Sequence, residues 1–280
     1  YPTYQNLTKK AMLWYSRHLL VLPVCYPVPH LLMEKRNELV SILLPVHNNQ
    51  ATLKECLTSL LAQTYEPCEI IAIDDFSRDN SFAILREFRR LDKRVKVYRN
   101  VKHYGLTTTL NRCLKRSDGK FVAFMDPQDI SAKDRIKKQV RFLTENSKTV
   151  AVGSQCMFLD EAKRKIGKSE FPQEHDNIYN KLVNGISIQF ETVLINTYLL
   201  PKDIMYFYKH EYPVIYTDLF VKLQKYGNFA NLKECLYTRM KDSSTTLETV
   251  KTQLLPHLML FFKARFLHDY RPSVASLFSR

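Results

Sequence analysis

Short apolar runs alternate with helical patterns through the first half of the chain, and this alternation constrains the fold more than any other feature. Strands and helices that alternate at this pitch predict an α/β domain with a mostly parallel sheet flanked by helices. The runs predict buried strands at Leu39–Pro45, Glu69–Asp74, Val95–Tyr98 and Lys120–Met125. Helical spacing of apolar residues begins near Gln50 and recurs over Asp79–Leu91 and Leu106–Lys115.

The second half of the chain has a weaker pattern. It predicts a basic helix from Asp134 to about Thr144, a strand at Val150–Gly153 and a helix at Thr217–Lys225. From Thr246, apolar residues at helical spacing predict a terminal amphipathic helix.

These patterns divide the chain into four parts. The sheet with its acidic strand ends is expected to form the ligand-binding half, and the less regular part is expected to complete the site. The parts are a basic and apolar arm (1–38), a first α/β half (39–128), a second half (129–240) and a C-terminal helical extension (241–280).

Acidic residues stand where strands of the predicted sheet end. Asp74 and Asp75 close the second strand, Asp126 follows the fourth with Asp129 close behind it, and Asp218 lies near the start of the later helix. Each acid taken singly is explained as a cap or turn residue. Two such groups at the carboxyl edge of one sheet favour a ligand site, because ligands gather at that edge and carboxylates bind hard cations.

The chain lacks the glycine-rich loop with which many nucleotide-binding proteins hold phosphate, since its six glycines are scattered. Its formal net charge of +14 nevertheless indicates an anionic partner. Nucleic acid is a poor candidate, because the basic residues are not interleaved with aromatics and no nucleic-acid-binding module is recognisable. A phosphorylated small molecule and an anionic membrane surface remain.

Cysteine usage and hydropathy bear on the compartment. Six cysteines without Cys-x-x-Cys spacing predict reduced, mostly buried thiols in a cytosolic protein. The apolar stretch Leu19–Met33 is short and interrupted by three prolines, so it predicts neither a membrane span nor a signal peptide. The arm and the terminal helix are instead expected to lie on an anionic bilayer, with packing of that helix against the core as the alternative.

Several spaced motifs agree in order over about residues 39–240. They are Val40–Asn48, Leu57–Tyr65, Glu69–Ser77 with Asp79, Asn100, Gly105-Leu106, Asn111, Gly119–Asp126, Leu219–Leu223 and Tyr226–Asn231. Together they resemble family 2 glycosyltransferases. The resemblance implies a GT-A fold built on a Rossmann-type sheet, a nucleotide-sugar donor, and transfer of the sugar to an acceptor hydroxyl with inversion.

The same resemblance implies roles for residues of the first half. Pro45, Val46 and Asn48 match the turn that borders the nucleotide. Asp74 and Asp75 match the acids that contact the base and the ribose. His47 and His103 are expected near the donor pocket without a catalytic role.

The metal motif departs from the family pattern. Asp126 matches the first acid of the Asp-x-Asp motif, but the chain reads Asp126-Pro127-Gln128-Asp129, so Gln128 stands at the usual cation ligand. Because glutamine offers a carbonyl oxygen without charge, we expect Asp126 and Gln128 to hold Mg²⁺ or Mn²⁺ weakly. Nearby cations are expected to offset this weakness, with Lys102, Lys133 and Arg135 as candidates.

The residue at the position of the general base also differs from the family pattern. The Glu-Asp pair of the family falls on Ile215 and Tyr216, and tyrosine at its ordinary pKa is a poor base near neutral pH. Asp218 is the nearest carboxylate that could take the acceptor proton, although on a helix its side chain points about 200° away from that of Tyr216. A cap at the start of the helix is its alternative role.

The sequence therefore predicts a glycosyltransferase of the hexosyltransferase type that is cytoplasmic or peripheral at the inner face of the cell membrane. Its expected partners are a nucleotide-sugar donor and a glycan, polysaccharide or lipid-linked acceptor. The alternative is a catalytically impaired relative that acts as a binding or scaffold protein, which Gln128 and Tyr216 favour.

Overall fold

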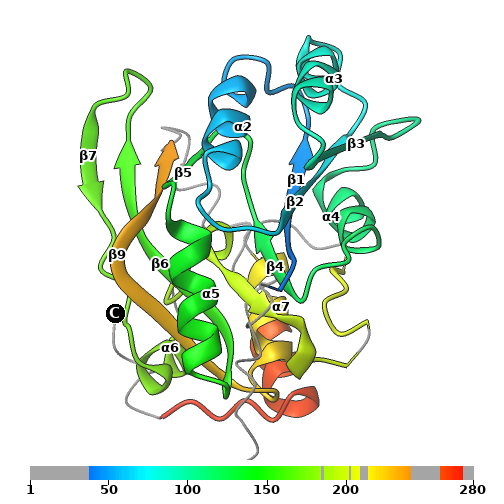
Figure 1. Cartoon of the computed structure of the whole chain (residues 1–280). Coiled ribbons are helices and arrows are strands. Elements are labelled where there is room, and N and C mark those ends of the chain that lie inside the picture. Colours follow the sequence, from blue (N-terminus) through cyan, green and yellow to red (C-terminus); the bar gives the residue numbers. More distant parts are fainter. Residues whose placement is uncertain (1–37, 184–185, 202, 209–213, 241–258, 274–280) are drawn as a thin grey trace, which may run out of the picture. The chain divides into compact units, whose positions relative to one another are not determined.

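A computed structural model describes residues 38–183, 186–201, 203–208, 214–240 and 259–273. A nine-stranded sheet runs through this part of the chain in the order β3-β2-β1-β4-β8-β6-β9-β5, with β7 beside β6 (Figure 1). The strands are β1 (Val40–Val46), β2 (Cys68–Asp74), β3 (Val95–Arg99), β4 (Phe121–Phe124), β5 (Ile130–Ser131), β6 (Thr149–Leu159), β7 (Lys165–Lys168), β8 (Leu194–Asn196) and β9 (Asn228–Met240).

The first four strands form a parallel half-sheet. β1 pairs in parallel with β2 on one side and with β4 on the other, and β2 pairs in parallel with β3. The register places Val46 opposite Asp74 and Leu43 opposite Phe124, so these strands end at the same edge of the sheet. The predicted mostly parallel sheet is confirmed here.

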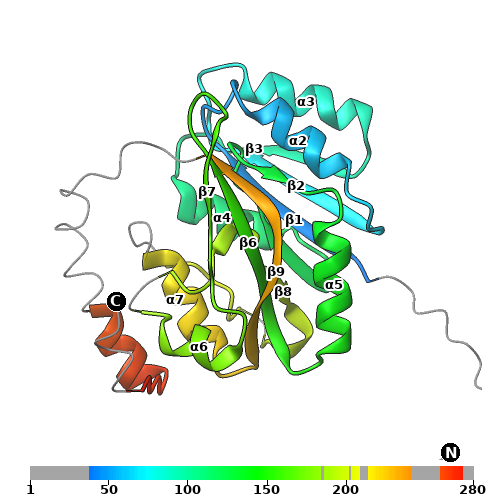
Figure 2. The same cartoon turned by 90° about the vertical axis from the view of Figure 1, so that its left-hand side faces the viewer.

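The rest of the sheet is mixed. β8 is antiparallel to both β4 and β6, while β6 and β9 run parallel as the two longest strands of the described chain. Figures 1 and 2 show β6 and β9 side by side. Because β8, β6 and β9 continue the sheet of β1–β4, the residues on both sides of position 128 share one sheet, and the predicted division there stays a prediction.

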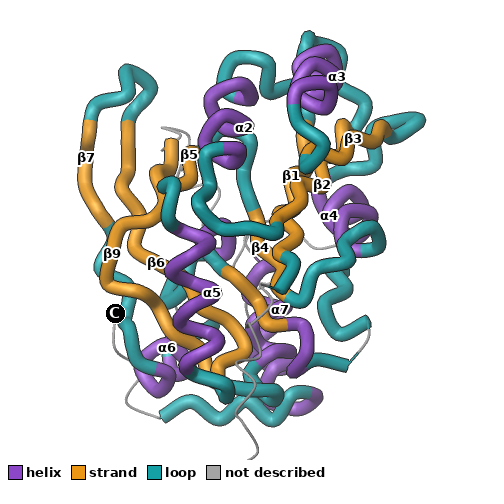
Figure 3. Tube along the Cα trace, in the orientation of Figure 1, coloured by secondary structure: helices purple, strands orange, loops and turns teal. Residues whose placement is uncertain are grey.

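Helices flank the sheet (Figure 3). They arise from the amphipathic patterns between strands, and each buries its apolar stripe. The helices are α2 (Leu53–Leu61), α3 (Ser81–Leu91), α4 (Leu106–Leu114), α5 (Arg135–Glu145), α6 (His175–Asn180) and α7 (Val214–Leu223), with 3₁₀ turns η1 (Phe190–Thr192) and η2 (Thr197–Leu199) and a last helix at 259–267.

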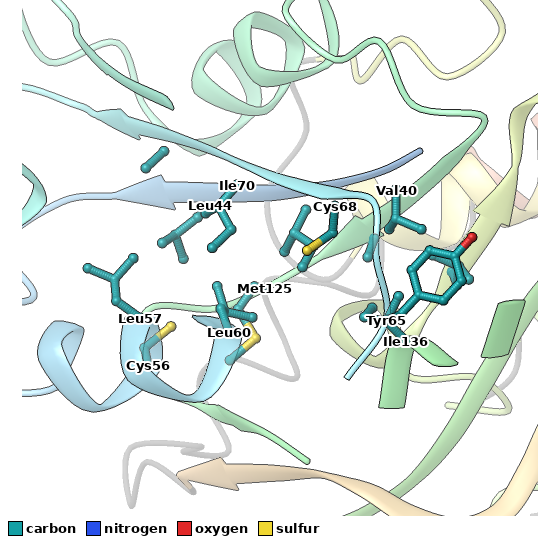
Figure 4. Close-up of a cluster of buried hydrophobic side chains, with 14 of the residues drawn as sticks. Val40, Leu44, Cys56, Leu57, Leu60, Tyr65, Cys68, Ile70, Met125 and Ile136 are labelled. Carbon is teal, nitrogen blue, oxygen red and sulfur yellow. The ribbon is translucent and has the colours of Figure 1, made fainter. Parts of the chain in front are cut away.

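Two apolar cores lie on the two faces of the sheet. Along β1, Ile42 and Leu44 point into one core and Leu43 into the other, as the period of a strand requires. The first core contains side chains of α2, α3 and α5, and Figure 4 shows Leu57 and Leu60 of α2 beside the strands. Each of these fully buried leucines contributes about 1.5–3 kcal/mol.

The second core contains side chains of α4, α6 and α7, and also Ala264 of the helix at 259–267. That helix therefore packs on the domain through one of its faces. The expected start of a helix at Thr246 and the residues of the arm lie outside the described residues.

The expected burial of most cysteines is confirmed among the described residues. Cys56, Cys68, Cys113 and Cys156 are buried and free, whereas Cys235 is free and exposed. No helix among the described residues is long and apolar enough to cross a membrane.

Candidate active site

A cavity of about 180 Å³ opens at the edge where β1 and β4 end, and we call it the strand-end cavity. It lies there because β1 and β4 are parallel neighbours in register, and the chain leaves the sheet at the same level after each of them. Segments from both halves of the chain close it. The lining residues are Pro45, His47, Asn49, Leu106, Leu110, Phe124, Met125, Asp126, Pro127, Gln128, Phe190, Glu191 and Tyr216.

Asp126 and Gln128 both line this cavity, in the turn that follows β4. The main-chain N–H of Gln128 donates to Oδ1 of Asp126 over 2.9 Å, and that of Asp126 donates to the hydroxyl oxygen of Tyr237 over 3.2 Å. Burial raises the pKa of the Asp126 carboxyl, and the nearby charge of Glu191 adds to the rise. The ionised form of the Asp126 carboxyl is stabilised by any cation that enters the cavity.

Asp129 anchors the turn and is not among the lining residues. Its Oδ1 accepts the main-chain N–H of Met240 over 3.0 Å, which ties the turn to the end of β9. Burial, followed by the charge of Asp126, raises the pKa of Asp129 to about 8.

Glu191 is a lining residue that our sequence interpretation missed. It lies on η1, and its Oε2 accepts from the guanidinium of Arg239 over 3.2 Å and from the side-chain amide of Gln189. The side chain is almost fully buried. The only signal in the sequence was that Glu191 is a single acid within the mostly apolar run Ile188–Ile195. Acids are rarely buried without a partner, so an acid in such a run indicates a special role.

Asp218 and Tyr216 occupy different surroundings, as the helical geometry predicts. The ring of Tyr216 lines the cavity and stacks on Phe190 with 3.8 Å between the ring centroids. Asp218 is not among the lining residues. Its carboxylate oxygens lie 2.6 Å from Nζ of Lys222 and 2.5 Å from Nζ of Lys263. Burial opposes the charge of Asp218, but hydrogen bonds from these two lysines outweigh it and lower its pKa.

Asp75 organises the loop between β3 and α4. Its Oδ1 accepts from the amide of Asn100 over 2.6 Å and from the main-chain N–H of Tyr104 over 2.9 Å, while Oδ2 accepts from the N–H of Gly105 over 2.8 Å. Gly105 has a φ of 84°, which glycine adopts without strain, and it directly precedes α4. The carboxylate of Asp75 therefore fixes the start of the helix that lines the cavity.

Asp74 is fully buried beside it. Its Oδ2 accepts from Nε of Arg99 over 3.0 Å and from the N–H of Ser77 over 3.2 Å, whereas Oδ1 is buried and has no hydrogen-bond partner in the part of the chain that the structure describes. Neither Asp74 nor Asp75 is among the residues that line the strand-end cavity.

The turn after β1 connects these parts. Pro45 lines the cavity, and the carbonyl of Val46 accepts the N–H of Asp75 over 2.7 Å. Asn48 has a φ of 55° and lies in the left-handed region, which asparagine tolerates. Its side chain accepts the N–H of Arg78 over 2.9 Å, so the turns after β1 and β2 hold each other in place.

Arg135 is unavailable for charge neutralisation in the cavity. Its guanidinium is fully buried, donates to the carbonyl of Phe124 over 3.1 Å and lies 5.1 Å from the centre of the Tyr237 ring. The expectation that Arg135 offsets weak metal binding is wrong, because its side chain is buried and donates to the main chain at the end of β4. Lys102 and Lys133 are not among the lining residues either.

The donor set of the cavity suits a hard divalent cation. Asp126 and Glu191 supply carboxylate oxygens and Gln128 supplies an amide oxygen, all lining the same space. Oxygen ligands of this kind are those that Mg²⁺ and Mn²⁺ prefer. The raised pKa of Asp126 also indicates a site that gains from added positive charge.

Comparisons with known proteins match this chain to glycosyltransferases. The sequence pattern described as "Glycosyl transferase family 2" matches residues 41–200. An uncharacterised glycosyltransferase of Haemophilus influenzae is 31% identical over 157 residues, which are 56% of this chain and 62% of that protein. The Escherichia coli protein named UDP-Glc:alpha-D-GlcNAc-diphosphoundecaprenol beta-1,3-glucosyltransferase WfgD is 31% identical over 175 residues, 62% of this chain and 67% of its own length.

Among solved structures, residues 1–349 of S. aureus TarS in complex with UDP-GlcNAc have a similar fold. The TM-score is 0.61 at 21% identity, over 75% of this chain and 60% of that one. This likeness places the described fold with the GT-A glycosyltransferase structures. The chain spans a little over three fifths of the length of the first curated relatives that it matches.

Proposed function

The chain belongs to glycosyl transferase family 2, and from this premise we propose that it transfers a sugar from a nucleoside-diphosphate sugar to an acceptor hydroxyl. The observation that carries the proposal is the strand-end cavity, where the carboxylates of Asp126 and Glu191 converge at the carboxyl edge of the parallel strands. Ligands of α/β sheets bind at this edge.

For the donor, we propose the residues that the resemblance assigns. Pro45, Val46 and Asn48 border the nucleotide, and Asp74 and Asp75 contact it. The buried Oδ1 of Asp74 has no hydrogen-bond partner within the described residues, so a donor hydroxyl would satisfy it, provided that the turns covering this fully buried carboxylate open when the donor binds.

Asp126 and Gln128 would hold a divalent cation, Mg²⁺ or Mn²⁺, with Glu191 beside them. Such a cation, when bound, neutralises charge on the leaving diphosphate. Because Gln128 carries no charge, we propose that the affinity for the cation is modest.

The reaction breaks the bond between the anomeric carbon and the diphosphate oxygen and forms a bond from that carbon to the acceptor oxygen. We propose that the acceptor attacks from the face opposite the leaving group, so that the configuration inverts. The acceptor proton passes to a carboxylate, which holds it after transfer. Positioning of donor and acceptor in one cavity supplies much of the rate enhancement.

For the base we propose Glu191 ahead of Asp218. Glu191 lines the cavity, and its two hydrogen bonds to described residues both use Oε2, so we assign Oε1 to the acceptor hydroxyl. Asp218 has both oxygens paired with lysines, and its lowered pKa makes it a weaker proton acceptor. Asp218 as the base stays a prediction from the sequence.

A glycan or lipid-linked acceptor at a membrane surface completes the proposal. The name of the E. coli relative, which specifies a diphosphoundecaprenol acceptor, supports it. In the helix at 259–267, Leu260 is buried whereas Phe262 and Phe266 are 52% and 76% exposed, with exposed Arg265 between them. Exposed aromatic rings beside a cationic side chain suit the interface of an anionic bilayer.

The test is donor turnover. Purified chain is incubated with UDP-, GDP- and dTDP-sugars and Mn²⁺, and the released nucleoside diphosphate is measured for the wild type, Asp126→Ala and Glu191→Gln. We expect turnover of one donor class by the wild type and a loss of about 100-fold or more in both variants, as for removal of a group that acts in the transition state.

Turnover that persists unchanged in Asp126→Ala would refute the assignment of this cavity. Nucleotide binding without turnover in the wild type, with or without acceptor lipids, would favour the catalytically impaired alternative. A loss confined to Asp218→Asn, with Glu191→Gln active, would return the base to Asp218.

A further inference from the structure

Two histidine rings and a carboxylate meet beside the strand-end cavity. His47 follows β1, Asp75 follows β2, and His103 lies between β3 and α4. One ligand atom of each residue lies within 4.8 Å of those of the other two, and among the described residues no other group of three His, Cys, Asp or Glu side chains has this spacing. The centroids of the two imidazole rings are 4.1 Å apart.

Asp75 orients both rings. Its main-chain carbonyl oxygen lies 2.9 Å from Nδ1 of His47, and its Oδ2 lies 3.0 Å from Nδ1 of His103. Both oxygens accept hydrogen bonds, so each Nδ1 carries a proton, and Nε2 is the nitrogen through which each neutral ring can bind an ion. Histidines that bind metal ions through one nitrogen commonly donate the other N–H to a carbonyl or a carboxylate in this way.

Asn48 provides an independent indication for His47. Its side-chain amide nitrogen lies 3.1 Å from Nε2 of His47. The amide oxygen of the same residue accepts the N–H of Arg78, which fixes the orientation of the amide. Because an amide nitrogen can only donate, Nε2 of His47 must be the acceptor, so its lone pair is held by the amide of Asn48, which a bound ion would displace.

We propose that Nε2 of His47 and Nε2 of His103 bind a divalent transition-metal ion of the Zn²⁺ class, with Asp75 as the positioning residue. Imidazole nitrogens suit Zn²⁺, Ni²⁺ and Co²⁺, whereas the oxygen ligands at Asp126 suit Mg²⁺ and Mn²⁺. Two protein ligands leave coordination positions open to water or to phosphate oxygens. The chain then carries two cation sites of different chemistry.

The proposed metal site is next to the strand-end cavity. His47 also lines the strand-end cavity, so an ion bound there adds positive charge to the wall of that cavity. The carboxylate of Asp75 is held by Asn100, Tyr104 and Gly105, so the rings have a rigid support in the absence of the ion. Metal binding itself does not depend on the proposed transferase activity.

Calorimetry on the full chain tests the proposal. The protein is prepared without a histidine tag, stripped with a chelator, and carries Cys25→Ser and Cys235→Ser, because free thiols also bind Zn²⁺. ZnCl₂ is titrated without nucleotide and with an excess of Mg²⁺. We expect one equivalent to bind, the Mg²⁺ to leave it in place, and His47→Gln/His103→Gln to abolish this binding.

Two further variants distinguish ligands from support. Asp75→Asn is expected to weaken Zn²⁺ binding about 10- to 100-fold, as for other hydrogen-bond partners of metal ligands. His175→Gln, which changes a histidine outside the cluster, is expected to bind as the parent protein does. Thermal melting without metal shows whether each variant is folded, and the single variants His47→Gln and His103→Gln give the same comparison if the double variant is not.

Three results overturn the proposal. They are the absence of stoichiometric Zn²⁺ binding by the parent protein, unchanged binding by the folded histidine variants, and a Co²⁺ spectrum with a thiolate charge-transfer band. Because no step uses a donor, failure here leaves the transferase proposal standing, and failure of donor turnover leaves this one standing.

Discussion

The pairing of Asp218 with two lysines predicts a structural role whose size can be worked out. The side chain of Asp218 is 1% exposed and that of Lys222 6% exposed, and Lys263 joins them from the helix at 259–267. Asp218→Asn keeps the shape of the side chain but removes the charge. The ammonium group of Lys222 is then buried with neutral partners, the carbonyl of Tyr206 at 2.9 Å and the ring of Tyr208, whose centre is 4.2 Å away.

Removal of one partner from a buried ion pair costs about 3–5 kcal/mol, because the other charge remains desolvated. Lys263 is partly exposed and recovers solvent, so it adds little. For a domain of this size, each kcal/mol lowers the melting temperature by about 2–4 °C. We therefore expect Asp218→Asn to melt about 6–20 °C below the wild type.

The assay is thermal and urea unfolding followed by circular dichroism, with Lys222→Met and the double variant as partners in a cycle. The double variant is expected to be more stable than Asp218→Asn, because it removes the unpaired buried charge. The lowered pKa of Asp218 sets the pH dependence. Its stabilisation is complete above the ordinary pKa of an aspartate and disappears as the pH falls through the lowered value.

A melting temperature of Asp218→Asn within 2 °C of the wild type would refute this reasoning. If such a stable variant also lost donor turnover, Asp218 would be a catalytic residue, as the sequence alone suggested. A destabilised variant with normal turnover at low temperature is the result we expect.

Three further predictions follow from other contacts. Glu69→Gln is expected to cost about 1–2 kcal/mol in urea unfolding at pH 7, since Glu69 accepts from Ser41 and pairs with the half-exposed Lys96. The pKa of Glu69 is lowered by these partners against the effect of burial, so the difference from the wild type should begin to shrink below the ordinary pKa of a glutamate and vanish once the pH falls through the lowered value. Gln128→Asp is expected to raise Mn²⁺ affinity at least about tenfold in calorimetry by restoring a charged ligand, and equal affinity would show that this side chain does not face the cation. Phe262→Ser/Phe266→Ser is expected to reduce flotation with anionic vesicles while Leu91→Ser, a matched change at another exposed apolar position, does not; equal flotation of all three proteins would remove this helix from the membrane contact.

The parallel half of the sheet was predictable from the sequence. Apolar runs that are buried on both faces have no polar alternation, so β1, β2 and β4 were found within one or two residues of their bounds. The helices between them followed from the 3.6-residue spacing. Local pattern was sufficient because the apolar spacing of each of these elements marks it as a strand or a helix without knowledge of its partner.

The second half depended on contacts that no local pattern encodes. β9 carries polar and charged residues such as Lys233 and Glu234 along thirteen residues, and it is a strand because β6 pairs with it far away in sequence. β8 is three residues long and lies between two strands that are antiparallel to it.

The candidate site shows the same division. Asp126 was found because strand-end acids share an edge, and Gln128 because the family resemblance matches it to the usual cation ligand; both line the cavity. Glu191 was missed because η1 reaches this edge only through the pairing of β8, and its partner Arg239 comes from β9. The pairing of Asp218 could not be predicted from residue spacing along its own helix, because Lys263 comes from the terminal helix.

Calorimetric titration of nucleotide sugars tests the central claim most directly. UDP-, GDP- and dTDP-sugars are titrated into the wild type and into Asp126→Ala, each with Mn²⁺ and with a chelator. The account predicts that one nucleotide class binds with a stoichiometry of one, that Mn²⁺ strengthens the binding, and that Asp126→Ala removes the strengthening by Mn²⁺. Absence of binding for all three classes in the presence of Mn²⁺, by a protein that is folded, would contradict it.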